Sequence, residues 1–181
     1  MIDPIYIETV EKMGEYMAGR GHELVFGAGA NGLMGAAARG VRRGGGKILG
    51  VIPEFFREDN IEEIYDDCDE LIFTDSMRER KSIMEDRADS FIVVPGGIGT
   101  YEELFEILTL KQLGRLDKTI VVLNLNSFYD NMLTALEGAM AENFITEKCR
   151  SIYKVTDDWQ RAVLLAEDFD PTAPVSELKK G

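Results

Sequence analysis

The chain has 181 residues, of which 45% are hydrophobic and 29% are charged, as is usual for a globular protein of one domain. Its formal net charge of −13 repels polynucleotide phosphates and argues against nucleic acid binding. No apolar run reaches the ~18–20 residues that span a bilayer, and the acidic N-terminus is unlike a secretory signal. Composition therefore predicts a cytoplasmic protein that does not enter membranes. Two distant cysteines and a single histidine argue against a metal site.

The first half of the chain alternates between helical and strand patterns. Apolar residues at helical spacing predict a helix over residues 5–20, and a short strand follows at 24–26. A helix of small residues ends in three glycines at 44–46, and a further strand runs to Pro53. Another strand falls within 69–75. Ser76 and Glu79 form the capping-box pattern that begins the next helix.

The second half repeats this alternation. Strands are expected at 91–95, 119–125 and 151–155. A helix is expected to follow the glycine-rich turn after the first of these strands and to run to about residue 113. Further helices are expected over 127–142 and over 157–167, and an aspartate caps the last one. Residues 1–167 are thus expected to form a single Rossmann-like domain, and residues 168–181 a flexible tail.

The fold class follows from the character of the strands. They are continuous apolar runs rather than alternating ones, which is typical of strands buried on both faces of a parallel sheet. The sequence therefore predicts an α/β protein with a doubly wound parallel sheet. In such folds ligands bind at the carboxyl ends of the strands, so the turns that follow the strands are the first places to look for a site.

The first such turn is GAGANG. Gly27, Gly29 and Gly32 satisfy the G-x-G-x-x-G spacing between a strand and a helix, where a phosphate can approach the backbone and the helix N-terminus. A close-packed turn explains the same pattern equally well. A nicotinamide enzyme would have an acidic residue at the end of the next strand. That strand ends in Val-Ile-Pro with Glu54 only afterwards, which weakens the dinucleotide interpretation.

The second turn is PGGIGTYEE, at residues 95–103. Backbone amides around Gly96, Gly97 and Gly99, together with the hydroxyl of Thr100, are placed to bind an anion at the start of a helix. The Gly-Lys-Ser/Thr of a Walker loop is absent. Thr100 is expected to cap the helix, and Thr100 with Glu103 also fits a capping box, which by itself would explain the glutamate.

The third candidate is the segment MRERK. Arg80 and Lys81, following Met77, would bring two cations to the strand ends if their helix begins beside a neighbouring strand. The alternative is a solvated helix face on which arginines and glutamates alternate, which is the commoner meaning of such a run.

Taken together, these motifs resemble those of the Lonely Guy family of cytokinin-activating nucleoside 5′-monophosphate phosphoribohydrolases. The resemblance rests on GLMG, VIPE, M-x-x-R-K and PGG-x-GT-x-E-E occurring in that order, and it spans about Asp3 to Glu167. It implies hydrolysis of the N-glycosidic bond of a purine nucleoside 5′-monophosphate without metal or organic cofactor, by a homodimer or larger homo-oligomer.

The resemblance also assigns roles to residues. It makes Arg80 and Glu103 the catalytic pair and residues 96–100 the phosphate loop. The expected substrate-binding set is Gly27, Gly29, Gly32, Met77, Lys81, Gly96, Gly97, Gly99 and Thr100. An oxocarbenium-like transition state explains the carboxylate, because negative charge stabilises the positive charge that develops on the ribose.

Two alternatives remain open at this point. A nucleotide-binding or molybdenum-cofactor carrier would use the glycine loops without needing an Arg80–Glu103 pair. A lysine decarboxylase is poorly supported, because nothing marks a Schiff-base lysine. The sequence also departs from the family pattern, since it begins after the central strand with which the family usually starts. We therefore expect two strands to lack one neighbour.

Overall fold

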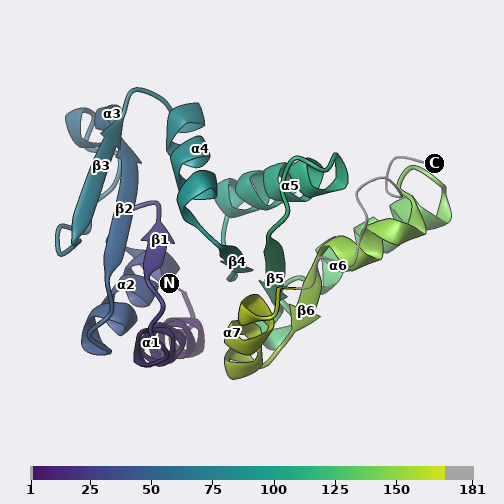
Figure 1. Cartoon of the computed structure of the whole chain (residues 1–181), viewed down its shortest axis with the longest axis horizontal. Helices are drawn as coiled ribbons and strands as arrows, with labels where there is room; N and C mark the ends of the chain where they lie inside the picture. The colour runs from purple at the N-terminus through teal and green to yellow at the C-terminus, as the bar shows by residue number, and fades with distance from the viewer. Residues whose placement is uncertain (1, 170–181) are drawn as a thin grey trace. The chain divides into compact units, whose positions relative to one another are not determined.

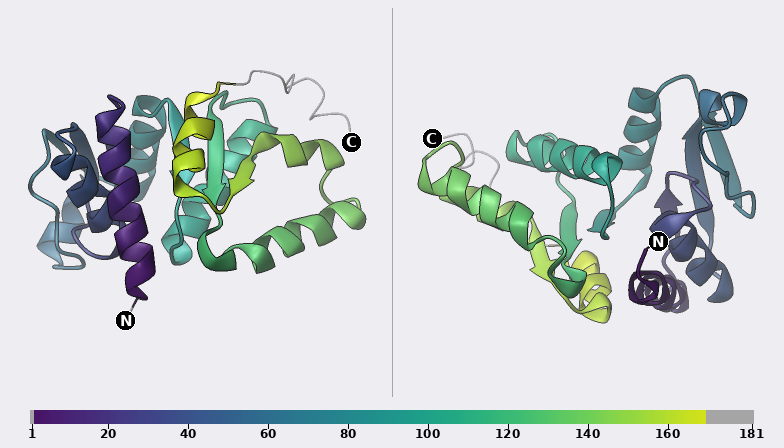
Figure 2. Two further views of the ribbon diagram at one scale, coloured as in Figure 1. Left: turned by 90° about the horizontal axis from the view of Figure 1, so that it is seen from below. Right: turned by 180° about the vertical axis from the view of Figure 1, so that it is seen from behind.

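The computed structural model describes residues 2–169 (Figures 1 and 2). The predicted tail lies outside these residues, apart from 168 and 169. The α-helices are α1 Pro4–Gly19, α2 Gly32–Arg43, α3 Glu54–Glu58, α4 Met77–Arg87, α5 Ile98–Gln112, α6 Asp130–Ala141 and α7 Trp159–Glu167. The strands are β1 Leu24–Phe26, β2 Ile48–Pro53, β3 Glu70–Thr74, β4 Ser90–Val93, β5 Thr119–Leu123 and β6 Lys154–Thr156; two 3₁₀ segments are η1 Leu125–Ser127 and η2 Glu147–Ile152.

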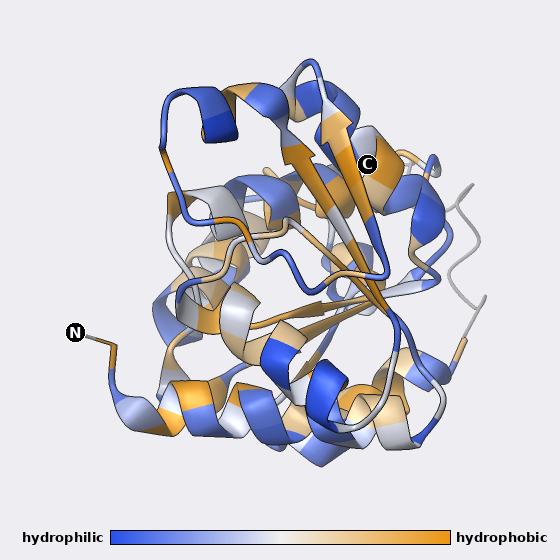
Figure 3. Cartoon of the chain, turned by 90° about the vertical axis from the view of Figure 1, so that its left-hand side faces the viewer, coloured by the Kyte–Doolittle hydropathy of each residue, from blue (hydrophilic) through white to orange (hydrophobic). Residues whose placement is uncertain are grey.

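The chain forms two compact units, Met1–Ala88 and Asp89–Gly181. In the first unit, β1, β2 and β3 form a parallel sheet in that order, with Leu24 opposite Ile48 and Leu49 opposite Glu70. Every residue of the central strand β2 is buried, and the strands appear hydrophobic in Figure 3. Helices α1 and α2 pack side by side. Their backbones come so close that a Cβ on Gly40 would overlap the carbonyl group of Glu11.

The second unit contains the parallel sheet β4-β5-β6, in which β5 is central and wholly buried. Helix α7 packs against β4, β5 and β6. Side chains from α5 and the strands form one hydrophobic cluster, which includes Val93, Leu104, Ile107, Ile120, Val122 and Tyr129. The predicted α/β class with parallel strands is confirmed in both units.

Two of the three predicted helix caps are confirmed. Ser76 accepts a hydrogen bond from the Glu79 amide at 3.2 Å, while the Glu79 carboxylate accepts one from the Asp75 amide at 2.9 Å. Asp158 accepts from the amides of residues 160 and 161 at the start of α7.

The third predicted cap is wrong. Helix α5 begins at Ile98 with Gly97 as its N-cap and no side-chain cap bond, so Thr100 lies inside the first turn. Glycine is accepted at N-caps because it places no side chain against the entering chain. The Thr100 side chain instead packs on Gly96, where an added Cβ would overlap its hydroxyl. Glu103 consequently falls in the second turn of the helix, past the capping-box position.

Each sheet has two edges, so four strands have a single partner among the described residues: β1 and β3 in the first sheet, and β4 and β6 in the second. Strand β1 pairs only with β2, and β4 pairs only with β5. The expectation that two strands lack a neighbour stays a prediction, because all four edge strands have a single partner. None of the helices in residues 2–169 is long and apolar enough to cross a bilayer.

Candidate functional site

Arg80 is the one charged residue that α4 buries, with 7% of its surface exposed. Its Nε donates a hydrogen bond to the carbonyl oxygen of Val51 in β2 at 3.1 Å, and its Nη1 lies 3.9 Å from the sulfur of Met77. Arg78 and Glu79, beside it in sequence, are exposed. The solvated-face interpretation is therefore wrong for Arg80. Burying a guanidinium is costly unless it is well bonded, and the carbonyl of Val51 supplies one of the bonds that this position requires.

The glycine turn after β1 packs on side chains of the same unit. A Cβ added to Gly27 would overlap the Arg80 guanidinium, and one added to Gly29 would overlap the Glu62 carboxylate and the Met34 methyl group. Gly32 has a φ of 59°, a left-handed conformation that glycine adopts without strain. The turn thus needs glycine because Arg80 and Glu62 lie directly on its backbone.

Glu62 was missed by the sequence analysis, and the backbone explains its placement. Residues 62–65 run antiparallel along the glycine turn: the Tyr65 amide donates to the Ala28 carbonyl and the Ala30 amide to the Glu63 carbonyl, both at 2.8 Å. This brings the carboxylate of Glu62 onto Gly29. The sequence did offer one signal, because a glycine-rich turn of this kind is expected to have an acidic partner. Here that acidic residue comes from the connection between α3 and β3 rather than from the end of β2.

Electrostatics link Glu62 to Arg80. Burial raises the pKa of Glu62 above its ordinary value, and the positive charge of Arg80 acts in the opposite direction with the smaller effect. The carboxylate is therefore partly desolvated beside a buried cation. Such a pair, next to the turn at the end of β1, offers a hydrogen-bond acceptor and a positive charge on one surface of the first unit.

We expect Glu62→Gln to stabilise the protein in a pH-dependent way. Because the folded state raises the pKa, the folded protein holds the Glu62 proton more tightly than the unfolded chain does, and stability falls as pH rises through the folded pKa. Glutamine does not ionise, so the difference in stability between the variant and wild type should be small at pH 4 and grow towards pH 7. Thermal unfolding of both proteins at the two pH values measures this. An equal difference at both would contradict it.

The second unit carries the PGGIGT turn between β4 and α5. Apart from the adjoining backbone, no atom of the described residues lies within 4 Å of a Cβ added to Gly97 or Gly99, and both glycines are exposed. The residues at the start of α5 are therefore accessible from outside the second unit's core, and an anion-binding helix start requires such access. Glu103 is partly buried, one turn further along the helix. Because α5 begins at Ile98, capping no longer explains this glutamate.

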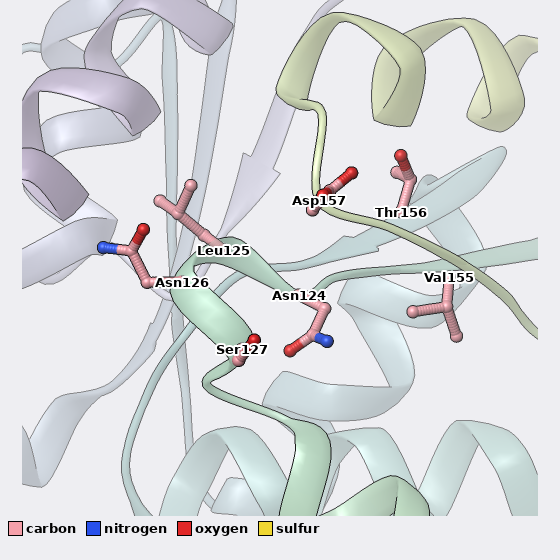
Figure 4. A pocket seen from close by; sticks show the side chains of 7 residues that line it. All are labelled: Asn124, Leu125, Asn126, Ser127, Val155, Thr156 and Asp157. Carbon is pink, nitrogen blue, oxygen red and sulfur yellow. The ribbon is translucent and has the colours of Figure 1, made fainter.

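A cavity of about 460 Å³ lies elsewhere in the second unit, at the carboxyl ends of β5 and β6 (Figure 4). It is lined by Asn124, Leu125, Asn126, Ser127, Val155, Thr156 and Asp157, none of which is a predicted site residue. Across residues 2–169, no group of three or more histidine, cysteine or acidic side chains is arranged to hold a metal ion.

Comparison with known proteins identifies the family. Residues 34–165 match the family described as "Possible lysine decarboxylase". Over 158 residues, 87% of this chain and 83% of the relative, the sequence is 40% identical to a cytokinin riboside 5′-monophosphate phosphoribohydrolase of Mycobacterium tuberculosis. The chain belongs to the family described as "Possible lysine decarboxylase", which includes these phosphoribohydrolases. The predicted membership is thereby confirmed.

Other members agree. An enzyme of the same name from Rhodococcoides fascians is 39% identical, and the match covers 87% of this chain and 79% of the relative. One from rice is 38% identical, and the match covers 92% of this chain and 68% of the relative. Among solved structures, the molybdenum cofactor carrier protein of Chlamydomonas reinhardtii has a TM-score of 0.67 at 22% identity, covering 91% of this chain and 88% of its own. At that identity the likeness shows a shared fold only.

Proposed function

We propose that the protein hydrolyses the N-glycosidic bond of a purine nucleoside 5′-monophosphate, of cytokinin type or AMP. The observation that carries this proposal is the identity of up to 40% with phosphoribohydrolases of that name over most of both chains. Water adds to C1′ of the ribose as the bond from C1′ to the base nitrogen breaks. The base leaves with a proton, and the products are the free base and ribose 5-phosphate.

Glu103 and Arg80 are the proposed catalytic residues. Positive charge develops on the ribose as the base departs, and a carboxylate such as Glu103 stabilises it electrostatically or takes a proton from the attacking water. Arg80 acts on the negative charge of the ligand, either at the phosphate or at the departing base. Their pairing comes from the family motifs, and the burial of Arg80 against β2 supports its part.

The phosphate is assigned to the start of α5. Gly97 and Gly99 are exposed and Thr100 packs on Gly96, which would give an anion access to the backbone at the start of this helix. Met77, Lys81 and the glycines of residues 27–32 complete the proposed substrate-binding set. Glu62 joins it because its carboxylate lies on that glycine turn, and carboxylates at such turns hydrogen-bond ribose hydroxyls in related folds. The cytoplasmic location predicted from composition is part of the same proposal.

The test compares AMP, an N6-substituted AMP and adenosine as substrates, with chromatographic detection of the free base. We expect release from both monophosphates and little from adenosine, because the nucleoside has no phosphate to bind at α5. Tight binding of AMP without release would instead favour the nucleotide-binding or carrier alternative. Equal release from adenosine and AMP would contradict the assigned role of the phosphate turn.

We also propose a homodimer that uses the exposed face of α5. Ile98, Phe105 and Leu113 lie at helical spacing on this face, and are 89%, 41% and 51% exposed. Exposed apolar stripes of this kind usually mark interfaces between proteins.

Phe105→Glu is therefore expected to shift the protein from dimer to monomer, because the interface would bury an unpaired charge. The matched control is Phe144→Glu, which changes a phenylalanine of the same unit that is 86% exposed and lies outside the stripe. Light scattering after gel filtration gives the mass of each. A wild-type monomer, or a Phe105→Glu dimer as stable as the control, would contradict the proposal.

A further inference from the structure

Tyr129 is completely buried, yet its hydroxyl reaches the strand that leads into the PGGIGT turn. The side chain is 0% exposed and belongs to the hydrophobic cluster of the second unit. Its hydroxyl donates a hydrogen bond to the carbonyl oxygen of Val94 at 2.6 Å. Val94 directly precedes Pro95 and Gly96, so this bond holds the chain at the point where β4 becomes the turn.

The backbone of Tyr129 is held in turn by Asn124, at the end of β5. The Asn124 side-chain oxygen accepts a hydrogen bond from the Tyr129 amide, and its side-chain nitrogen donates one to the Asp130 carboxylate, both at 2.7 Å. The backbone amide of Asn124 donates a hydrogen bond to the carbonyl oxygen of Thr156 in β6 at 2.8 Å. Tyr129 is thus connected by hydrogen bonds to the ends of β4, β5 and β6.

The chain accepts backbone strain to place Tyr129 there. Asn126 and Ser127, two of the cavity-lining residues shown in Figure 4, have φ values of 51° and 59° in the left-handed region. Asparagine tolerates this conformation, whereas for serine it is uncommon. Strain of this kind persists only where surrounding contacts impose it, and it is often found near functional sites. Here the strained turn lets the chain reverse between β5 and the buried tyrosine.

The ring of Tyr129 also contacts the helix that follows the PGGIGT turn. It packs edge-to-face against Tyr101 of α5, with centroids 5.8 Å apart and planes at 79°. Tyr101 lies in the first helical turn, two residues before Glu103. Burial raises the pKa of Tyr129 well above its ordinary value, so the hydroxyl remains a donor at neutral pH. One side chain therefore touches both ends of the segment 94–101.

We infer that Tyr129 is a positioning residue for the phosphate turn, fixing the residues between Val94 and Tyr101 relative to the sheet. This role rests on the proposed function insofar as it concerns catalysis, since the turn is the assigned phosphate site. The hydroxyl acts through Val94 and the ring through Tyr101, while Asn124 sets the position of both. Tyr129 itself touches neither substrate nor reacting atoms.

Tyr129→Phe tests the role because it removes only the hydroxyl. Hydrogen exchange followed by mass spectrometry should show faster exchange of the amides at residues 96–100, with β5 amides unchanged. The KM for AMP should rise about three- to tenfold, the range of one neutral hydrogen bond, while kcat changes less than twofold. The control is Tyr153→Phe, which removes the hydroxyl of another partly buried tyrosine packed against the same cluster.

A second variant keeps the test valid if Tyr129→Phe unfolds. Asn124→Asp retains the acceptor for the Tyr129 backbone amide but places its new carboxylate beside that of Asp130. It should raise exchange at residues 96–100 and the KM in the same direction as Tyr129→Phe, but by less. Exchange at residues 96–100 that matches wild type in a folded variant would overturn the inference, as would a lower melting temperature with an unchanged KM. If wild type releases no base, the proposed function fails, while the exchange result still decides the role of Tyr129.

Discussion

Glu103→Gln is expected to lower kcat for base release from AMP by about 100-fold or more, with AMP still bound. The substitution keeps the size and hydrogen-bonding shape of the side chain but removes the charge that stabilises an oxocarbenium-like ribose, an electrostatic loss of the size seen for other transition-state contacts. Because α5 begins at Ile98, Glu103 has no capping role whose loss would unfold the helix. Melting temperature should therefore change little.

The matched control for this prediction is Glu102→Gln. Glu102 is its exposed neighbour on the same helix and should retain nearly full activity. Single-turnover measurements separate chemistry from binding. Activity of Glu103→Gln within a few-fold of wild type would remove Glu103 from the proposed mechanism, and equal losses in both variants would point to a general effect on α5.

The second large effect is expected at Arg80. Arg80→Ala should reduce kcat/KM by about 100-fold or more, because the proposed contact of this buried cation with the charged ligand is lost. Gly27→Ala offers a subtler test of the same residue. Its methyl group would displace the Arg80 guanidinium from the end of β1 without changing any charge, and we expect it to lower kcat/KM by about tenfold.

Two controls match these variants. Arg78→Ala removes an exposed arginine from the same helix, and Gly19→Ala adds a methyl group that meets no atom of the described residues within 4 Å beyond the adjoining backbone. Both should leave kcat/KM nearly unchanged. Full activity in Gly27→Ala together with a large loss in Arg80→Ala would show that the exact position of the guanidinium is unimportant. Full activity in both would remove Arg80 from the mechanism.

The sequence predicted most of the elements because their signals are local. The continuous apolar run of β2 indicated a strand covered on both faces, and all six of its residues are buried. Ser76 and Asp158 formed the caps that their spacing indicated, since a cap depends only on residues two to four positions away. Arg80 and Glu103 were predicted as site residues from motifs rather than from local physics, which favoured a solvated helix face for Arg80 and a cap for Glu103.

The parts that could not be predicted depend on contacts distant in sequence. The burial of Arg80 follows from α4 packing on β2, which a run of alternating charges does not reveal. Glu62 reaches Gly29 only because residues 62–65 bind along the glycine turn. The start of α5 was misplaced by three residues, because a glycine N-cap carries no side-chain signal. The role of Tyr129 likewise depends on a bond to Val94, 35 positions away.

The most direct test of the proposed function is the product analysis of AMP incubated with wild-type protein in ¹⁸O-labelled water. Hydrolysis predicts free adenine and ribose 5-phosphate in equal amounts, with one labelled oxygen entering the sugar at C1. Recovery of intact, unlabelled AMP after binding has been demonstrated would contradict the proposal that this chain is a phosphoribohydrolase.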